Sequence, residues 1–338
     1  MPDIDSHAQE SINSRQTEDP DNVNDEDYRI RNLLNNGIEI RHRRMPVPDG
    51  PVSRNITAVL HADRSSPGPS TSQVDAYLDD LAEMSGGCTE TDLRRFFSGT
   101  VFHERFDPLF GRSRGLGLAL HALMPAHLVP DEQPRISQPR PHLLFGYTHD
   151  HGQDSFVKLH TQSNGMLHQT ISDFSEVTDH GLSYPFLVVE YTDGRGAGSR
   201  WATVNRCAAG TTACLAVVNQ LNRTLTESNP DKESSAPHPT TVDNIVYAMA
   251  IDHDLVHVYV GWMEDNDKGV PNTQDKHIMQ LAESFALWQP DGFTGFRRCV
   301  RNILAWGIGP RREAICKALG ALVDGSRTME YKTKPSEV

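Results

Sequence analysis

The stretch Tyr184–Thr192, YPFLVVEYT, decides the fold class. It is almost continuously apolar and rich in aromatic and β-branched side chains, which is typical of a central strand buried on both faces. Strand alternation places Glu190 and Thr192 on one face of it. The glycine-rich loop Asp193–Ser199 follows, and a helix is expected from Trp201 to about Asn222. The sequence therefore predicts a strand, loop and helix unit of an α/β protein.

Working outward, four more short apolar runs are predicted to be strands of the same sheet. These runs are His142–Thr148, Asp243–Ile251, Leu255–Trp262 and Lys276–Phe285. We expect the first of them to pair with the central strand. Pro290 is expected to open a helix, and Gly307–Pro310 to break it before a final helix. The predicted fold is a mixed α/β core, a central mixed sheet flanked by helices.

Composition divides the chain around this core. Residues 1–27 are predicted to be a disordered acidic tail, because residues 1–30 hold nine acids against two arginines and almost no large apolar side chains. We expect residues 28–140 to form a mainly helical region packed on the core at 141–325. Residues 224–241 are predicted to be a disordered loop, and 326–338 a flexible tail.

Charge and hydropathy exclude two classes of protein. The chain has 32 basic and 45 acidic residues, a net charge of −13, which does not suit a uniformly basic nucleic-acid binder. No apolar stretch reaches the roughly 18 residues of a membrane-spanning helix, and no membrane partner is expected. Five cysteines without a CxxC pair suggest reduced thiols. We therefore expect an intracellular protein of the nucleus or cytoplasm, without a secretory signal.

The pair Glu190 and Thr192 has a chemical interpretation. Nucleases of the PD-(D/E)xK class hold Mg²⁺ between an acid on one strand and an acid on the next, and a lysine two residues further on activates water. A single Glu-x-Thr is a weak form of this pattern. A glutamate that is simply buried, or at the rim of the sheet, is the alternative.

Several segments together resemble an uncharacterised domain widespread in filamentous fungi, whose members read PDLLYGY, YPFxVxExK, A-x-NQC and FRxYVRNIxxWG. The matching segments are Pro141–Tyr147, Tyr184–Glu190, Trp201–Cys207, Phe296–Ile303 and Trp306–Gly307. The resemblance covers roughly residues 28–325. It implies a restriction-endonuclease-like fold preceded by a helical region, and no specific activity.

The chain departs from that family at the positions that would carry chemistry. His142 stands where the family has aspartate, Thr192 where it has lysine and Arg206 where it has glutamine, whereas Glu190 is kept. The resemblance thus implies a degenerate centre in which these four are vestigial catalytic positions. Glu190 is the candidate metal ligand, and His142 favours softer ions than Mg²⁺. We expect no cofactor unless the centre is active, in which case Mg²⁺ or Mn²⁺ is needed.

Basic residues near the C-terminus give the candidate nucleic-acid surface, although a solvated helix face is the simpler alternative. They are Arg297, Arg298, Arg301, Arg311 and Arg312. The sequence favours a non-catalytic, nuclease-like domain that interacts with nucleic acid or protein. One alternative is an active phosphodiesterase using Glu190 with partners that have migrated from other positions. Another is a small-molecule or nucleotide binder using the glycine loop at 194–198.

Overall fold

The structure is a computed structural model. It describes residues 23–24, 27–63, 68–102, 116–124, 136–148, 181–192, 200–227, 241–264 and 275–333. Expectations for nearly all of the acidic tail, for the glycine loop at 193–199 and for residues 228–240 lie outside these ranges.

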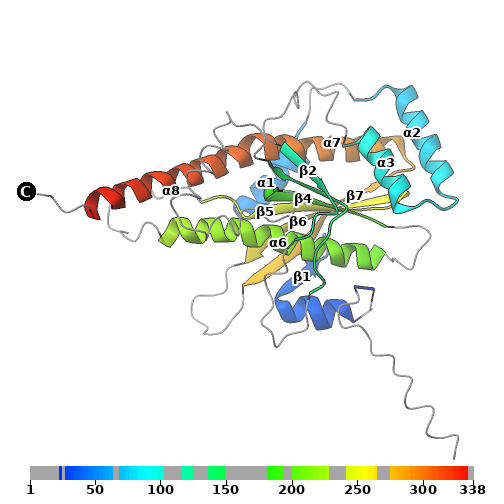
Figure 1. Ribbon diagram of the computed structural model, residues 1–338. Coiled ribbons are helices and arrows are strands. Elements are labelled where there is room, and N and C mark those ends of the chain that lie inside the picture. Colours follow the sequence, from blue (N-terminus) through cyan, green and yellow to red (C-terminus); the bar gives the residue numbers. More distant parts are fainter. Residues whose placement is uncertain are drawn as a thin grey trace, which may run out of the picture.

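A seven-stranded mixed sheet forms the centre of the described part, which confirms the predicted fold class (Figure 1). In spatial order its strands are β1 (Ile38–Arg41), β7 (Lys276–Ala286), β6 (Leu255–Glu264), β5 (Ile245–Ile251), β4 (Ser183–Tyr191), β3 (Leu143–Tyr147) and β2 (Leu116–Leu120). The pairs β1–β7 and β4–β5 are parallel. The other neighbouring pairs are antiparallel. Every residue of β3, β4 and β5 is buried, as the apolar runs predict.

Helices cover both faces of this sheet (Figure 1). The long helix α6 (Arg200–Glu227) packs along β4 and β5. Helix α7 (Pro290–Trp306) packs against β7, and α1 and α2, which come from the first part of the chain, pack against α7. The described helices are α1 (Pro51–Leu60), α2 (Thr71–Met84), α3 (Glu90–Thr100), α6 (Arg200–Glu227), α7 (Pro290–Trp306) and α8 (Arg312–Thr333), with short turns η1 (Arg29–Leu33), η2 (Leu34–Asn36) and η5 (Gly307–Arg311).

The region 28–140 contributes more than helices. It supplies β1 and β2, the two edge strands of the sheet, which the sequence analysis did not predict. These strands have four and five residues, too short for a clear alternation pattern. Two other boundaries also differ. Helix α6 extends to Glu227, inside the predicted loop at 224–241, and α8 extends to Thr333, inside the predicted C-terminal tail.

The expected break at Gly307–Pro310 is instead a π-helical turn, η5, that joins α7 to α8. A widened turn accommodates Pro310, which has no N–H to donate to a regular helix. Gly307 packs where a Cβ atom would collide with the ring of Phe186, and its carbonyl oxygen accepts a 2.6 Å hydrogen bond from the Tyr147 hydroxyl. The glycine therefore lets the helix pass closely over the ends of the strands.

The predicted pairing of the first and central strands is confirmed, and it positions the candidate site. Strands β3 and β4 are antiparallel, with Leu143 opposite Val189. The residue before β3, His142, therefore lies beside Glu190. The backbone N–H of Tyr191 donates a 2.9 Å hydrogen bond to Nδ1 of His142, which extends the pairing through a side chain.

A buried histidine on β7 makes stability depend on pH. His277 is 5% exposed, and neither ring nitrogen has a hydrogen-bond partner among the described residues. Burial lowers its pKa to about 4, because the charged imidazolium is poorly solvated there. The folded state therefore binds this proton less readily than the unfolded state, whose histidines titrate near 6.5.

We predict that His277 removes up to about 3 kcal/mol from the free energy of unfolding as the pH falls from about 6.5 to about 4. His277→Leu should abolish that part of the pH dependence, because no proton then binds in either state. Urea unfolding across this pH range measures it, with the exposed His42→Asn as the matched control. Equal pH dependence in the wild type and His277→Leu would contradict the prediction.

Candidate functional site

Glu190 and His142 form the centre of a polar cluster at the β3–β4 pair. Oε2 of Glu190 lies 2.7 Å from Nδ1 of His142. The glutamate side chain is 1% exposed and that of the histidine 11%, so the pair is almost completely removed from water. Of the two alternatives for Glu190, a position at the rim is therefore wrong, and a simply buried glutamate agrees with the structure. A carboxylate this deeply buried needs compensation by a proton donor or a cation.

The structure leaves that compensation incomplete. Nδ1 of His142 already accepts the hydrogen bond from Tyr191, so in this tautomer it has no proton for Glu190. Oε2 of Glu190 accordingly has no hydrogen-bond partner among the described residues. Nε of Arg206 is 3.6 Å away, an ion pair without a hydrogen bond. The site therefore favours an additional positive charge or proton beside Glu190.

The other two predicted positions reach the same cluster from β4 and α6. Oγ1 of Thr192 donates a 3.0 Å hydrogen bond to Oγ1 of Thr203 on α6, and Nη2 of Arg206 donates to the same Thr203 oxygen at 3.2 Å. The structure thus brings His142, Glu190, Thr192 and Arg206 together. Thr192 is tied to the helix and supplies no cation, so Arg206 is the positive group beside Glu190.

Two residues of the cluster were missed by sequence reasoning, Glu90 and His121. Oε2 of Glu90 lies 2.9 Å from Nε2 of His142, on the side of the ring away from Glu190. Nε2 of His121 lies 3.8 Å from the other oxygen of Glu90. His121 follows β2 directly, and the antiparallel register of β2 and β3 sets it opposite His142.

The local backbone structure at Glu90 and at His121 is distinctive. Glu90 is the first residue of α3, whose start is held by a capping box between Thr89 and Asp92. This capping box can be recognised in the sequence Thr89–Asp92, but its place beside β3 depends on tertiary packing. His121 has a left-handed backbone with φ of 49°, unusual outside glycine and frequent at functional sites. No short-range sequence pattern predicts that conformation.

The electrostatics of His121 keep its ring neutral near pH 7. Burial lowers its pKa most, the carboxylate of Glu90 opposes that shift, and the neighbouring Arg94 and Arg140 lower the pKa further. Nη1 of Arg94 lies 2.7 Å from Nε2 of His121. Because a guanidinium can only donate, this nitrogen of His121 is an acceptor whose lone pair points at a cation.

Chemically, the cluster offers nitrogen and oxygen ligands at metal-binding spacing. One ligand atom from each of Glu90, His121 and His142 lies within 4.8 Å of the others. The predicted ligand Glu190 faces Nδ1 of His142 instead, on the opposite side of the ring. The resulting donor set is one carboxylate and two imidazoles, which suits zinc-like ions better than Mg²⁺.

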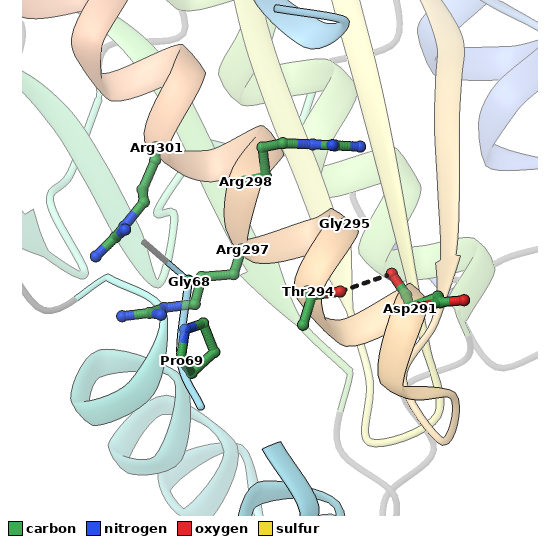
Figure 2. Close-up of a pocket in the computed structure, with 8 residues that line it drawn as sticks. All are labelled: Gly68, Pro69, Asp291, Thr294, Gly295, Arg297, Arg298 and Arg301. Carbon is green, nitrogen blue, oxygen red and sulfur yellow. Dashed lines mark hydrogen bonds between the residues drawn. The ribbon is translucent and has the colours of Figure 1, made fainter. Parts of the chain in front are cut away.

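The predicted basic surface is only partly available. Arg297, Arg298 and Arg301 on α7 line a cavity of about 370 Å³ with Gly68, Pro69, Asp291, Thr294 and Gly295 (Figure 2). Arg297 and Arg301 extend to one side of the helix and Arg298 to the other (Figure 2).

Arg311 was wrongly assigned to this surface. It is 2% exposed and donates to the carbonyl oxygen of Ile245 at 2.9 Å, and it lies over the ring of Trp306. Its role is to hold η5 on the strand ends. Arg312 is half-buried, with Nε and Nη2 shielded from solvent, so only part of its guanidinium faces the surface. Periodicity alone did not reveal this burial, because the π turn changes which face each residue takes.

The fold and cluster define a mixed α/β protein with a buried carboxylate–imidazole site. Residues 79–319 match the family described as "Domain of unknown function (DUF7924)", and the chain belongs to this family. The match includes α3, β2, β3, β4 and α6, and hence every residue of the cluster. A comparison with curated proteins gives no match. Among the described residues, no helix is long and apolar enough to cross a membrane.

We predict that Glu190→Ala lowers the free energy of unfolding by about 1–3 kcal/mol, because it leaves a cavity and removes the carboxylate that pairs with Arg206. Glu190→Gln should cost less, since it keeps the side-chain volume and leaves no cavity. Urea denaturation at pH 7 compares the three proteins. Loss of less than about 0.5 kcal/mol in Glu190→Ala would contradict the structural importance of this contact.

Proposed function

We propose that this protein is a non-catalytic, nuclease-like domain that binds nucleic acid through the arginine face of α7. The arginine face is defined as Arg297, Arg298 and Arg301. The observation that carries the proposal is the cavity lined by these three side chains. Asp291 is the acidic residue in the same lining, so the cavity has a positive balance in a chain whose net charge is −13.

The dimensions and surroundings of the cavity suit a phosphate backbone. Its volume of about 370 Å³ is large enough for a phosphodiester with its sugar. Arg297 is partly held in place by a 3.1 Å hydrogen bond from its Nε to the carbonyl oxygen of Thr100. A guanidinium that is already ordered loses less entropy when it binds phosphate.

An exposed aromatic residue supports the same proposal. Trp288 is 60% exposed and precedes α7 by two residues, close in sequence to the arginine face. Indole rings on nucleic-acid-binding surfaces stack on unpaired bases, and each stacked base contributes about 1–3 kcal/mol. Trp288 does not line the cavity itself, so a partner that contacts both Trp288 and the arginines has to extend along α7, as a single strand of nucleic acid would. An acidic protein is the other partner that such a surface fits.

The absence of catalysis is part of the proposal and rests on the cluster. Thr192 takes the place of the lysine that would activate water, and its hydroxyl bonds to Thr203. His142 takes the place of an acidic Mg²⁺ ligand. Arg206, the cation beside Glu190, stays protonated and cannot accept a proton from water. Resemblance to the restriction-endonuclease-like fold supports the shared ancestry that this proposal assumes.

We predict that Arg297→Gln/Arg298→Gln/Arg301→Gln weakens nucleic-acid binding and flattens its salt dependence. Each lost phosphate contact should reduce the slope of log affinity against log salt by about 0.9 on duplex DNA and about 0.7 on a single strand. Fluorescence anisotropy with labelled single-stranded and duplex oligonucleotides across a salt series measures both quantities.

The matched control carries the same loss of charge elsewhere, in Arg31→Gln/Arg44→Gln/Arg223→Gln, whose side chains are exposed on other elements. It should keep the wild-type slope apart from a small general effect of net charge. No binding by the wild type at about 50 mM salt, where attraction to phosphate is strong, would refute the nucleic-acid role. Binding to acidic peptides alone would identify a protein partner.

A second candidate function is supported by Glu90. This residue brings a carboxylate to within 2.9 Å of His142 and so restores an acid that the strand positions lack. The cluster then resembles an active metal-dependent phosphodiesterase with a migrated acid. The missing proton acceptor near a metal-bound water makes this candidate weaker than the first.

We predict no cleavage of single-stranded or duplex DNA, or of RNA, above background with Mg²⁺ or Mn²⁺. Gel analysis of labelled substrates tests this, with Glu190→Ala and Glu90→Gln as paired variants. Cleavage by the wild type that disappears in both variants would overturn the non-catalytic proposal and establish the second candidate.

An intracellular location, in the nucleus or cytoplasm, belongs to the same proposal. All five cysteines are free thiols, and Cys88, Cys207, Cys214 and Cys299 are buried. Burial raises the pKa of the Cys207 thiol well above its ordinary value, so this group is unreactive. Thiols of this kind suit a reducing compartment.

A further inference from the structure

The donor atoms of Glu90, His121 and His142 converge from three separate elements. Glu90 comes from the start of α3, His121 follows β2 and His142 precedes β3. Their ligand atoms lie within 4.8 Å of one another, and the two imidazole rings stand at 83° with centroids 5.4 Å apart. Ligands of a tetrahedral zinc ion lie about 3.3 Å from each other, as bond lengths near 2.0 Å require. Small side-chain rotations are enough to reach that spacing.

A buried carboxylate orients His142 toward this convergence. Glu190 is 1% exposed and lies 2.7 Å from Nδ1, while Nε2 faces Glu90. Histidines that bind metal usually donate their other N–H to a carboxylate, which fixes the tautomer and makes the ligating nitrogen more basic. If the proton moves to Nδ1, Oε2 of Glu190 gains a hydrogen bond and Nε2 presents a lone pair, while the N–H of Tyr191 gives up Nδ1 as its acceptor. Metal binding at Nε2 favours this tautomer, and it would supply the hydrogen bond that Oε2 of Glu190 lacks.

His121 presents a lone pair that already faces a positive charge. Its Nε2 lies 2.7 Å from Nη1 of Arg94, a residue one turn along α3 from Glu90. Arg94 therefore places a cation against one of the three ligand atoms. The side chain of His121 is 36% exposed and that of Glu90 31%, and Arg94 is half-buried, so an ion that binds Nε2 of His121 has to displace this guanidinium.

We propose that Glu90, His121 and His142 bind one divalent zinc-class ion, with Glu190 as the orienting partner of His142. The donor set of two imidazoles and one carboxylate selects Zn²⁺ and similar ions over Mg²⁺ and Ca²⁺, which prefer oxygen. Three protein ligands leave a fourth position, which water or a phosphate oxygen can occupy. This inference goes beyond nucleic-acid binding, because it involves none of the α7 arginines.

A metal-free arrangement competes with this proposal. A doubly protonated His142 can bridge the two carboxylates, with Nε2–H toward Glu90 and Nδ1–H toward Glu190. That arrangement fits the distances from His142 to both carboxylates and leaves His121 paired with Arg94, and it too removes the acceptor of the Tyr191 N–H. The two arrangements differ in whether the protein takes up an ion, which titration with metal alone decides.

The experiment uses the full chain without a polyhistidine tag, stripped with a chelator and then titrated with Zn²⁺ and with Co²⁺. By calorimetry we expect each chain to bind one Zn²⁺ ion tightly. The absorption spectrum of bound Co²⁺ should indicate four- or five-fold coordination and should lack the charge-transfer band of a thiolate ligand. Zn²⁺ should raise the melting temperature, because the ion binds the folded state preferentially.

The variants assign the bound ion to these residues. Binding of the single Zn²⁺ ion should be lost in each of the three ligand variants, Glu90→Gln, His121→Asn and His142→Asn. In Glu190→Gln the affinity for Zn²⁺ should fall about 10- to 100-fold. Arg94→Gln should raise it, since no guanidinium then competes. His253→Asn, the same substitution at a histidine that pairs with Asp254, should leave it unchanged. Glu90 and His121 are partly exposed, so their variants remain testable even if His142→Asn fails to fold.

Three results would overturn the proposal. The first is that the wild type binds no Zn²⁺ tightly. The second is that Zn²⁺ binding survives in Glu90→Gln and His121→Asn, and the third is that Arg94→Gln lowers the affinity for Zn²⁺. Anisotropy on the same variants separates this site from the proposed function. Normal nucleic-acid binding by Glu90→Gln with loss of Zn²⁺ supports two independent sites, whereas loss of Zn²⁺ uptake in the Arg297→Gln/Arg298→Gln/Arg301→Gln protein would contradict the assignment.

Discussion

The contact between Glu190 and His142 is the constraint on which the rest of the site depends. It sits at the β3–β4 pair, where a one-residue slip in register would turn Glu190 to the opposite face of the sheet. The central position of β4, between β3 and β5, prevents that slip, because both neighbours hold its backbone. A charged group that would be costly anywhere else in this core is therefore held in one orientation.

Different helices contact the two members of the Glu190–His142 pair. On one side, α6 brings Arg206 and Thr203 to Glu190 and Thr192. On the other, α3 brings Glu90 to His142 and is anchored by Phe97, which stacks on Tyr191 with ring centroids 6.1 Å apart. Glu190 is thus cut off from water, while Glu90 and His121 form the accessible mouth of the cluster. An ion from solvent can therefore reach the ligand atoms of Glu90 and His121, while the buried Glu190 orients His142.

Strands β3 to β7, and the face that Glu190 and Thr192 share, could be predicted because they follow from short-range sequence patterns. Short apolar runs identified β3 to β7, and alternation along β4 predicted that Glu190 and Thr192 share one face, which is the face where the structure places α6. Sequence reasoning failed where tertiary packing decides. Glu90 lies 52 residues before His142 in the chain, and nothing local to either residue indicates that they meet. Arg311 belongs to a cluster of basic residues in the sequence, yet the π turn buries it under the strand ends.

The most direct test of the account is anomalous scattering from crystals of the full chain grown with Zn²⁺, measured on both sides of the zinc absorption edge. The account predicts one strong anomalous peak within bonding distance of Glu90, His121 and Nε2 of His142, with Arg94 displaced and Nδ1 hydrogen-bonded to Glu190. A map without a peak there, in which His142 bridges Glu90 and Glu190 and Arg94 still contacts His121, would contradict it.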